Sequence, residues 1–188
     1  MPPKPKYDRE AIIDIAVDLV REKGADSLTA REMAEYLGTS SRPIFTAFQN
    51  MSELKTAVIA KCSDLFEKYC AEEMASGKYP QYKAMGMAYV RLALEESNIF
   101  KLLFMRDRSN ENTDKNKQYF NAVSVVQGQT GYSTEIAERM HFEMWVFVHG
   151  IATMLATGYV DLDFETVSEL ITDAYQGIKR RFFDGQNN

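Results

Sequence analysis

Apolar and polar positions follow the period of an α-helix along most of the chain. In "YDREAIIDIAVDLVREKG", Ile12, Ala16 and Leu19 share one face, Asp8 is placed to cap the start and Gly24 ends the pattern, so the segment predicts an amphipathic helix. No segment alternates with period two over the length of a strand. The sequence therefore predicts an all-α fold, with later helices from Ser52 as a cap to about Ser76, from Pro80 to about Ser97, in "NIFKLLFM", and over 133–157 and 164–183. The polar segment "RDRSNENTDKNKQ" predicts a loop or a frayed helix start.

Two short helices near the N-terminus are joined at a glycine. "LTAREMAEYLG" predicts the first, with Thr29 as N-cap, Glu32 as the partner in a capping box and Gly38 after the last turn. We expect the second to begin with Ser40 as its cap. Pro43 would then be the third helical residue, where the backbone N–H has no intrahelical partner and a proline removes no bond.

The second short helix has a core side and an outer side. At 100° per residue, Ile44 and Phe48 point one way, with Ala47 beside them. Arg42, Thr46 and Gln49 point the opposite way, and Phe45 sits on the flank. Residues 29–48 therefore predict a helix-turn-helix whose second helix fits a DNA major groove.

The outer side chains have the chemistry for reading DNA. Arginine can bond to O6 and N7 of guanine, so Arg42 is the candidate for a base contact, while Ser41 and Thr46 suit phosphate. Pro43 and Phe45 can touch a thymine methyl group. Thr29, Ala30 and Arg31 would face phosphate from a helix N-terminus, Ser40 would lie next to Arg42, and Lys4, Lys6 and Arg9 could form an arm beside the groove.

The segment "TAREMAEYLGTSSRPIFTAFQNMSELKTAV", residues 29–58, resembles the TetR family of bacterial transcriptional regulators. Downstream, "MWVFVHGIATML" is similar to the Trp, His-Gly signature of one group of TetR ligand-binding domains, the WHG-like group. Two positions depart from the family pattern. Phe45 stands where an operator-contacting tyrosine is usual, and Met51 stands where a lysine commonly opens the fourth helix, a charge that Lys55 could replace.

The resemblance implies an architecture and a function. Residues 1–60 would form a three-helix DNA-binding head, and residues 61–188 a helical bundle for ligand binding and dimerisation. The protein would be a transcriptional repressor that binds a palindromic DNA operator as a homodimer and is released by a small molecule. The alternative from the residues alone is a helical binding or scaffold protein whose helix-turn-helix reads no DNA.

Charge and cysteine content add constraints. The net charge is -5, but residues 1–61 hold nine Lys+Arg and nine Asp+Glu, so any basic surface there must come from sorting charges onto different faces. No uninterrupted apolar run reaches membrane-spanning length and the N-terminus lacks a signal-peptide core, so we expect no membrane partner and a cytoplasmic location. Cys62 and Cys70 would be about 12 Å apart on one helix, too far for a disulfide, so both are predicted to be reduced packing residues.

The C-terminal part is rich in aromatic and methionine residues. An apolar pocket for a flat hydrophobic ligand is one interpretation, and a filled core is the other. A homodimer through the last two long helices is predicted from Gly150, Gly158 and Gly177 and from apolar Ile171, Tyr175 and Ile178, unless these pack only within the chain. The predicted pocket lining is Met85, Tyr89, Phe100, Phe104, Phe120, Phe142, Trp145 and His149.

Enzyme chemistry has little support. Ser52 and Lys55 match the S-x-x-K spacing of penicillin-binding enzymes, but no K-T-G follows. His141 and His149 lie two helical turns apart rather than one, and no cysteine or carboxylate cluster completes a tetrahedral metal site. No phosphate-binding loop or dinucleotide fingerprint is present. We therefore expect no catalysis, no metal and no cofactor.

Overall fold

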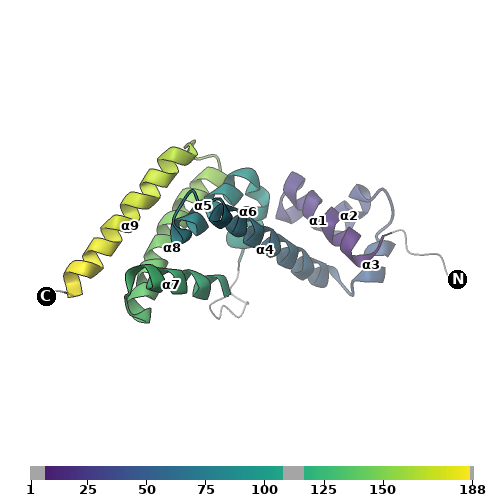
Figure 1. Cartoon of the computed structure of the whole chain (residues 1–188). Coiled ribbons are helices and arrows are strands. Elements are labelled where there is room, and N and C mark those ends of the chain that lie inside the picture. The colour runs from purple at the N-terminus through teal and green to yellow at the C-terminus, as the bar shows by residue number, and fades with distance from the viewer. Residues whose placement is uncertain (1–6, 108–116, 187–188) are drawn as a thin grey trace. The chain divides into compact units, whose positions relative to one another are not determined.

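The computed structural model describes residues 7–107 and 117–186, and every regular element in these ranges is a helix (Figure 1). This confirms the predicted all-α fold. No helix in the described part of the chain is long and apolar enough to cross a membrane. The elements are α1 (Arg9–Lys23), η1 (Ala25–Ser27), α2 (Ala30–Tyr36), α3 (Arg42–Ala47), α4 (Met51–Ala75), α5 (Gln81–Glu95), α6 (Ser97–Phe104), α7 (Lys117–Thr130), α8 (Thr134–Ala156) and α9 (Phe164–Gln186).

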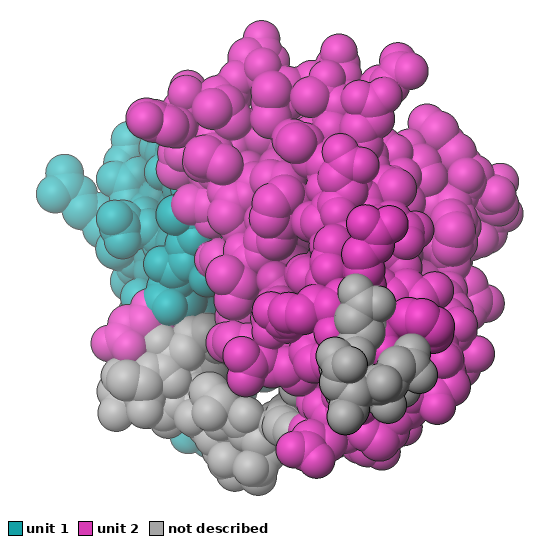
Figure 2. All heavy atoms as spheres, turned by 90° about the vertical axis from the view of Figure 1, so that its left-hand side faces the viewer, with its two compact units in different colours: residues 1–67, 95–106 teal, residues 68–94, 107–188 magenta. Residues whose placement is uncertain are grey.

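The chain divides into two compact units, coloured separately in Figure 2. Unit 1 comprises residues 1–67 and 95–106, and unit 2 comprises residues 68–94 and 107–188. The division falls inside α4 and again at the end of α5. Unit 1 is therefore discontinuous in sequence, because α6 belongs to it while the segments on either side of α6 belong to unit 2.

Unit 1 is built around α1. Asp8 caps this helix by accepting the Ala11 N–H at 2.9 Å, and Gly24, with φ of 84°, ends it while donating its N–H to Val20 O. Residues from α2, α3, α4 and α6 are buried in the same core, and α6 packs against α1. This core contains Ile12, Ala16, Leu19, Val20, Leu28, Met33, Ile44, Phe48, Leu54, Val58, Ile99 and Phe100.

The caps of α2 and α3 correct two details of the prediction. Thr29 caps α2 as expected, since its hydroxyl accepts the Glu32 N–H, but the box is not completed because the Glu32 carboxylate accepts from Lys23 Nζ at 3.0 Å instead. The cap of α3 is Ser41, not Ser40, because Ser41 O is the first carbonyl to accept helical N–H groups. Pro43 is consequently in the second helical position, where it still removes no bond.

The start of α4 was also misplaced by sequence. The helix begins at Met51, and the Glu53 N–H donates to Asn50 Oδ1 at 3.0 Å. Asn50 is therefore the cap, and Ser52, predicted as the cap, lies in the first turn. Both residue types cap helices well, so the pattern alone did not separate them.

In unit 2, α8 packs along both α7 and α9. Ser133 caps α8 by accepting the Ile136 N–H. Helix α7 was not predicted, and it contributes Val123 and Val126 to a buried cluster with Ala137 and Met140. Of the predicted polar segment, residues 108–116 lie outside the described residues, while Lys117 and Gln118 begin α7. Around the cluster pack Tyr82, Tyr132, Ile136, Tyr175, Ile178 and Phe182.

Candidate functional site

Helix α3 has a buried side and an exposed side. Ile44 and Phe48 are almost fully buried, while Arg42, Phe45 and Thr46 are exposed. The Thr46 hydroxyl donates to Arg42 O at 2.9 Å, and the Arg42 N–H donates to Ser40 Oγ at 3.4 Å. These are local backbone contacts, so the guanidinium of Arg42 is directed by no described partner. The structure thus separates the two faces of α3 as the spacing predicted.

The other predicted DNA-facing residues also belong to unit 1. Thr29 and Arg31 are exposed at the start of α2, with Ala30 half-buried between them. Lys55 is exposed in the first part of α4. Ser40 is exposed, whereas Ser41 and Pro43 are half-buried at the start of α3.

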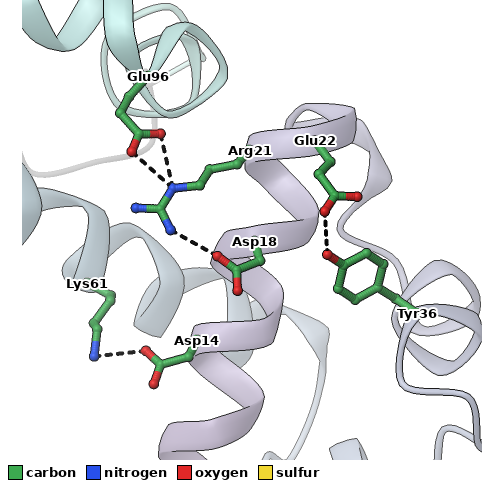
Figure 3. A network of polar contacts seen from close by, with 7 residues as sticks. All are labelled: Asp14, Asp18, Arg21, Glu22, Tyr36, Lys61 and Glu96. Atoms are coloured by element: carbon green, nitrogen blue, oxygen red, sulfur yellow. Dashed lines mark hydrogen bonds and ion pairs between the residues drawn. The ribbon is translucent and has the colours of Figure 1, made fainter.

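Basic residues of unit 1 fall into two groups. Lys61 pairs with Asp14 and Glu10 at 3.0 Å, and these carboxylates raise the pKa of its ammonium group. Arg21 donates through Nε to both carboxylate oxygens of Glu96 and through Nη1 to Asp18 at 2.9 Å (Figure 3). These cations are neutralised by local carboxylates.

The second group has no such partner. Within residues 7–107 and 117–186, Arg31, Arg42 and Lys55 form no ion pair with a carboxylate. All three are exposed. The unpaired cations of this region are therefore exposed on α2, on α3 and near the start of α4.

Arg9 does not extend from the protein as the predicted arm would require. Its Nη1 donates to Ala47 O at 2.8 Å and pairs with Glu53 Oε1 at 2.9 Å, and the guanidinium lies 4.1 Å from the centre of the Phe48 ring. Lys4 and Lys6 lie outside the described residues. Sequence reasoning missed this role because the partners of Arg9 are about 40 residues away, and no local pattern marks such a pairing.

Three of the predicted pocket residues meet in unit 2. The Tyr89 hydroxyl and His149 Nδ1 share a hydrogen bond of 2.8 Å, and the Trp145 ring stacks on His149 with 5.6 Å between centroids. Phe142 follows one turn earlier on α8, 6.2 Å from Trp145. Met85 is half-buried on α5, in the same unit. Burial lowers the pKa of His149.

The remaining predicted pocket residues are not placed with this group. Phe100 and Phe104 belong to unit 1, where their rings are 5.3 Å apart and Phe104 meets Phe66 edge-on at 5.5 Å. Phe120 is a residue of α7, and its side chain lies outside the described part of the structure.

A second tyrosine–histidine pair was not anticipated. Tyr82 OH lies 3.0 Å from His141 Nδ1, and Tyr82 also contacts the Tyr175 ring. Burial lowers the pKa of His141 to about 4, so the imidazole is neutral at pH 7. The described residues contain no group of three or more His, Cys, Asp or Glu side chains arranged to hold a metal ion. The pair is consequently best described as a polar bond within an apolar environment.

The exposed surface of unit 2 is unusually apolar on α8 and α9. Phe142, Trp145 and Val146 are about half-exposed on α8, and Leu170 and Phe183 are exposed on α9. These are not the apolar residues that motivated the dimer prediction. Ile171 is buried, and Tyr175 and Ile178 are half-buried against the cluster of their own unit, so Ile171 has little surface left for a second copy while a dimer contact by Tyr175 and Ile178 stays a prediction.

The glycines of that prediction also differ in role. Gly158 follows the end of α8 with φ of 69°, a left-handed backbone conformation that glycine adopts more easily than other residues, so the turn accounts for a glycine here. No heavy atom lies within 4 Å of a Cβ built on Gly150 or Gly177, so both leave open space at the surface of their helices.

The geometry defines a class: an all-α protein with an N-terminal helix-turn-helix, followed by a helical bundle with an apolar outer face. The family model described as "Tetracyclin repressor-like, C-terminal domain" matches residues 82–175, half of the chain, including "MWVFVHGIATML". The fold is similar to that of a TetR-like transcriptional regulator from Rhodococcus sp. RHA1, with a TM-score of 0.69 at 15% identity, over 97% of this chain and 100% of that one. No curated protein matches the sequence.

The chain therefore belongs to the TetR family of transcriptional regulators. Regulators of this family bind DNA and small-molecule effectors and are usually dimers. The resemblance drawn from residues 29–58 and from the Trp, His-Gly segment is confirmed.

Proposed function

We propose that the protein is a cytoplasmic repressor that binds a palindromic operator through α3 as a homodimer, and that a small apolar or aromatic molecule releases it. The observation that carries the DNA-binding part is the exposed face of α3 beside the uncompensated cations of unit 1. The side chains of Arg42, Phe45, Arg31 and Lys55 are all exposed. The contacts we propose are Arg42 with a guanine, Phe45 with a thymine methyl group, and the other two with phosphate.

Charge compensation supports this assignment over that of a scaffold protein. A solvated helix face needs no particular arrangement of its cations, whereas a DNA-binding face needs cations that are not already paired. In unit 1, Arg21 and Lys61 are paired with carboxylates and lie on other helices, while Arg42 is not paired with any described one. Because such cations attract phosphates, operator binding should weaken as salt rises.

A gel shift with the purified protein and its own upstream DNA tests the proposal. We expect a saturable shift of an inverted repeat that a scrambled duplex does not compete away, because a two-fold dimer presents two recognition helices in opposite senses. A protein that binds neither upstream DNA nor an operator selected from random duplexes is instead the helical scaffold.

The dimer is proposed from the apolar outer face of α8 and α9. Val146 is 53% exposed and Phe142 is 51% exposed, and Gly150 leaves open space beside them. A second copy placed here would remove large apolar side chains from water. Light scattering at micromolar concentration should give twice the chain mass, and a mass near 21.5 kDa would contradict the dimer.

The effector site is proposed in unit 2, at the Trp145, His149 and Tyr89 group. A flat apolar molecule can stack on the indole ring, and the Tyr89–His149 bond supplies a polar element that can orient it. For release, the molecule must bind the DNA-incompetent state better than the competent one. Helix α4, which has residues in both units, is the proposed lever.

Quenching of Trp145, the only tryptophan, identifies candidate effectors. Each quenching compound is then titrated into an operator complex, where a coupling of about 1–3 kcal/mol weakens DNA binding about 5- to 150-fold. Compounds that quench Trp145 but leave operator affinity unchanged would refute the coupling while leaving DNA binding intact.

A further inference from the structure

Arg9 joins three helices of unit 1 at one point. It lies at the start of α1, it donates to the last carbonyl of α3, Ala47 O, and it pairs with Glu53 in the first turn of α4. Its guanidinium also covers the Phe48 ring at 4.1 Å. Because Phe48 is the C-cap of α3 and only 2% exposed, Arg9 contacts both the backbone and the buried anchor of that helix end.

Helix α3 needs support of this kind. It has six residues, far below the length at which a helix is stable alone. Its last carbonyls have no intrahelical donors, and a cation at a helix C-terminus is favourable for the helix dipole. Arg9 supplies both a donor for Ala47 O and the positive charge.

Glu53 completes the arrangement from the other side. Its Oε2 accepts the Gln49 N–H at 2.7 Å while Oε1 pairs with Arg9, and its own N–H donates to Asn50 Oδ1. The backbone bond from Gln49, followed by the Arg9 contact, holds the pKa of Glu53 below its ordinary value. The turn between α3 and α4 is thereby fixed by the same ion pair that fixes the end of α3.

We propose that Arg9 and Glu53 are positioning residues for the recognition helix: they set the angle at which α3 presents Arg42 and Thr46, and they do not contact DNA themselves. This inference rests on the proposed DNA-binding function. The competing role for Arg9, an arm contact to phosphate, uses the same positive charge but does not involve Glu53, so the two roles give opposite expectations for the acidic partner.

The test is operator binding by Arg9→Ala, Arg9→Lys and Glu53→Gln across a salt series, on the full chain. Glu53→Gln removes a negative charge near the proposed DNA face, so electrostatics alone would tighten binding. Positioning predicts weaker binding instead. We expect Arg9→Ala and Glu53→Gln each to weaken it about 5- to 20-fold, at the lower end for a charge-assisted hydrogen bond because both side chains are partly exposed. Arg9→Lys should recover part of the loss.

Two further readouts separate positioning from contact. The slope of affinity against salt should be unchanged in Arg9→Ala, whereas loss of a phosphate contact would lower it by about 1. Discrimination between the operator and a version changed at the Arg42-read base pair should fall, because a misplaced α3 reads bases poorly. The double variant should resemble Arg9→Ala alone, since both changes break one pair.

Lys61→Gln is the matched control, because it breaks an ion pair between α4 and α1 away from α3. It should leave base discrimination unchanged. Tighter binding by Glu53→Gln, or a lower salt slope with intact discrimination in Arg9→Ala, would overturn the proposal.

A readout without DNA keeps this proposal separate from the proposed function. In the protein alone, hydrogen exchange of the Phe48 amide, which donates to Ile44 O, should be faster in Arg9→Ala than in Lys61→Gln. Equal exchange would remove the basis for positioning even if operator binding is found. If the wild-type chain binds no DNA, the proposed function fails, and the exchange rates still decide whether Arg9 holds α3.

Discussion

Unit 1 and unit 2 hold their helices together by different means. Unit 1 contains α2 and α3, of seven and six residues, and ion pairs from α1 tie the helices around them: Arg9 to Glu53, Arg21 to Glu96 and Lys23 to Glu32. Unit 2 contains α8 and α9, of 23 residues each, which pack over much of their length around an apolar cluster.

The exposed surfaces of the two units also differ, one being marked by charged and the other by apolar side chains. Unit 1 exposes cations that its own carboxylates do not neutralise, while unit 2 exposes large apolar side chains on α8 and α9. Each short helix buries little apolar area, so ion pairs and hydrogen bonds hold the short helices in place. Those ion pairs neutralise most of the charged side chains that take part in them. The cations that are left without a carboxylate partner then indicate an anionic binding partner. In unit 2, packing already fixes the long helices, and the exposed apolar face is the informative surface.

The largest expected effect is a difference in stability between two substitutions: one removes a buried aromatic ring of unit 1, and the other removes an exposed aromatic ring of unit 2. Phe48→Ala should destabilise unit 1 by about 3–5 kcal/mol, because it opens a cavity under α3, whereas Phe142→Ala should cost about 1 kcal/mol or less. Urea unfolding by circular dichroism measures both, and Trp145 fluorescence reports on unit 2. These costs apply at concentrations where the chain is monomeric; because the proposed dimer covers Phe142, the cost of Phe142→Ala should grow with protein concentration, and a cost that stays at about 1 kcal/mol or less throughout would contradict that interface.

The next effect is a pH dependence of the stability of unit 2 that arises from His141. His141 binds its proton with a pKa of about 4 in the folded protein and near 6.5 when unfolded, so the unfolded state takes up more protons between these values. Stability is therefore complete above pH 6.5 and is lost as pH falls, by about 3 kcal/mol between pH 7 and pH 4. Unfolding followed by Trp145 fluorescence should show this slope, and His141→Gln should flatten it.

Carboxylates with lowered pKa, such as Glu143 and Asp163, act in the same direction at lower pH and remain in the His141→Gln variant as an internal reference. If wild type and variant lose stability in parallel from pH 7 to pH 5, His141 is not the cause.

The smallest effect concerns the exposed cation of α3. Arg42→Ala should weaken operator binding by about 1–3 kcal/mol and relax the preference at one base pair in each half-site, if the contact is bidentate. Lys55→Ala is the matched change, since loss of a phosphate contact should weaken all sequences alike and reduce the salt slope by about 1. A footprint of unchanged sequence and affinity for Arg42→Ala would show that α3 does not read bases through this residue.

The sequence predicted most of the helices and the two faces of α3 because both depend on residues that are only a few positions apart. The spacing of Ile44 and Phe48 decides which side of α3 is buried, and Thr29 and Ser133 cap their helices with contacts three residues away. Helix α7 was missed although Ala122, Val123 and Val126 have helical spacing, because the polar segment before it gave no start signal.

The pairings across the chain could not be predicted in the same way. Tyr82 and His141 are 59 residues apart, and Arg9 and Ala47 are 38 apart, so nothing in the local sequence connects them. Arg9 was interpreted as part of a basic arm because three cations lie close together near the N-terminus. Its actual contacts depend on where α4 places Glu53, which is a property of the tertiary fold.

The discontinuity of unit 1 has a consequence for how the protein is made. Arg21 precedes its partner Glu96 by 75 residues, and α6 must leave the ribosome before it can pack on α1. At a synthesis rate of about 5–20 residues per second, roughly 3–11 seconds pass between the synthesis of Phe48, at the end of the helix-turn-helix, and that of Phe104, at the end of α6. During that time the side of α1 that α6 contacts in the folded protein is exposed, and exposed apolar surface of this kind favours aggregation before folding is complete.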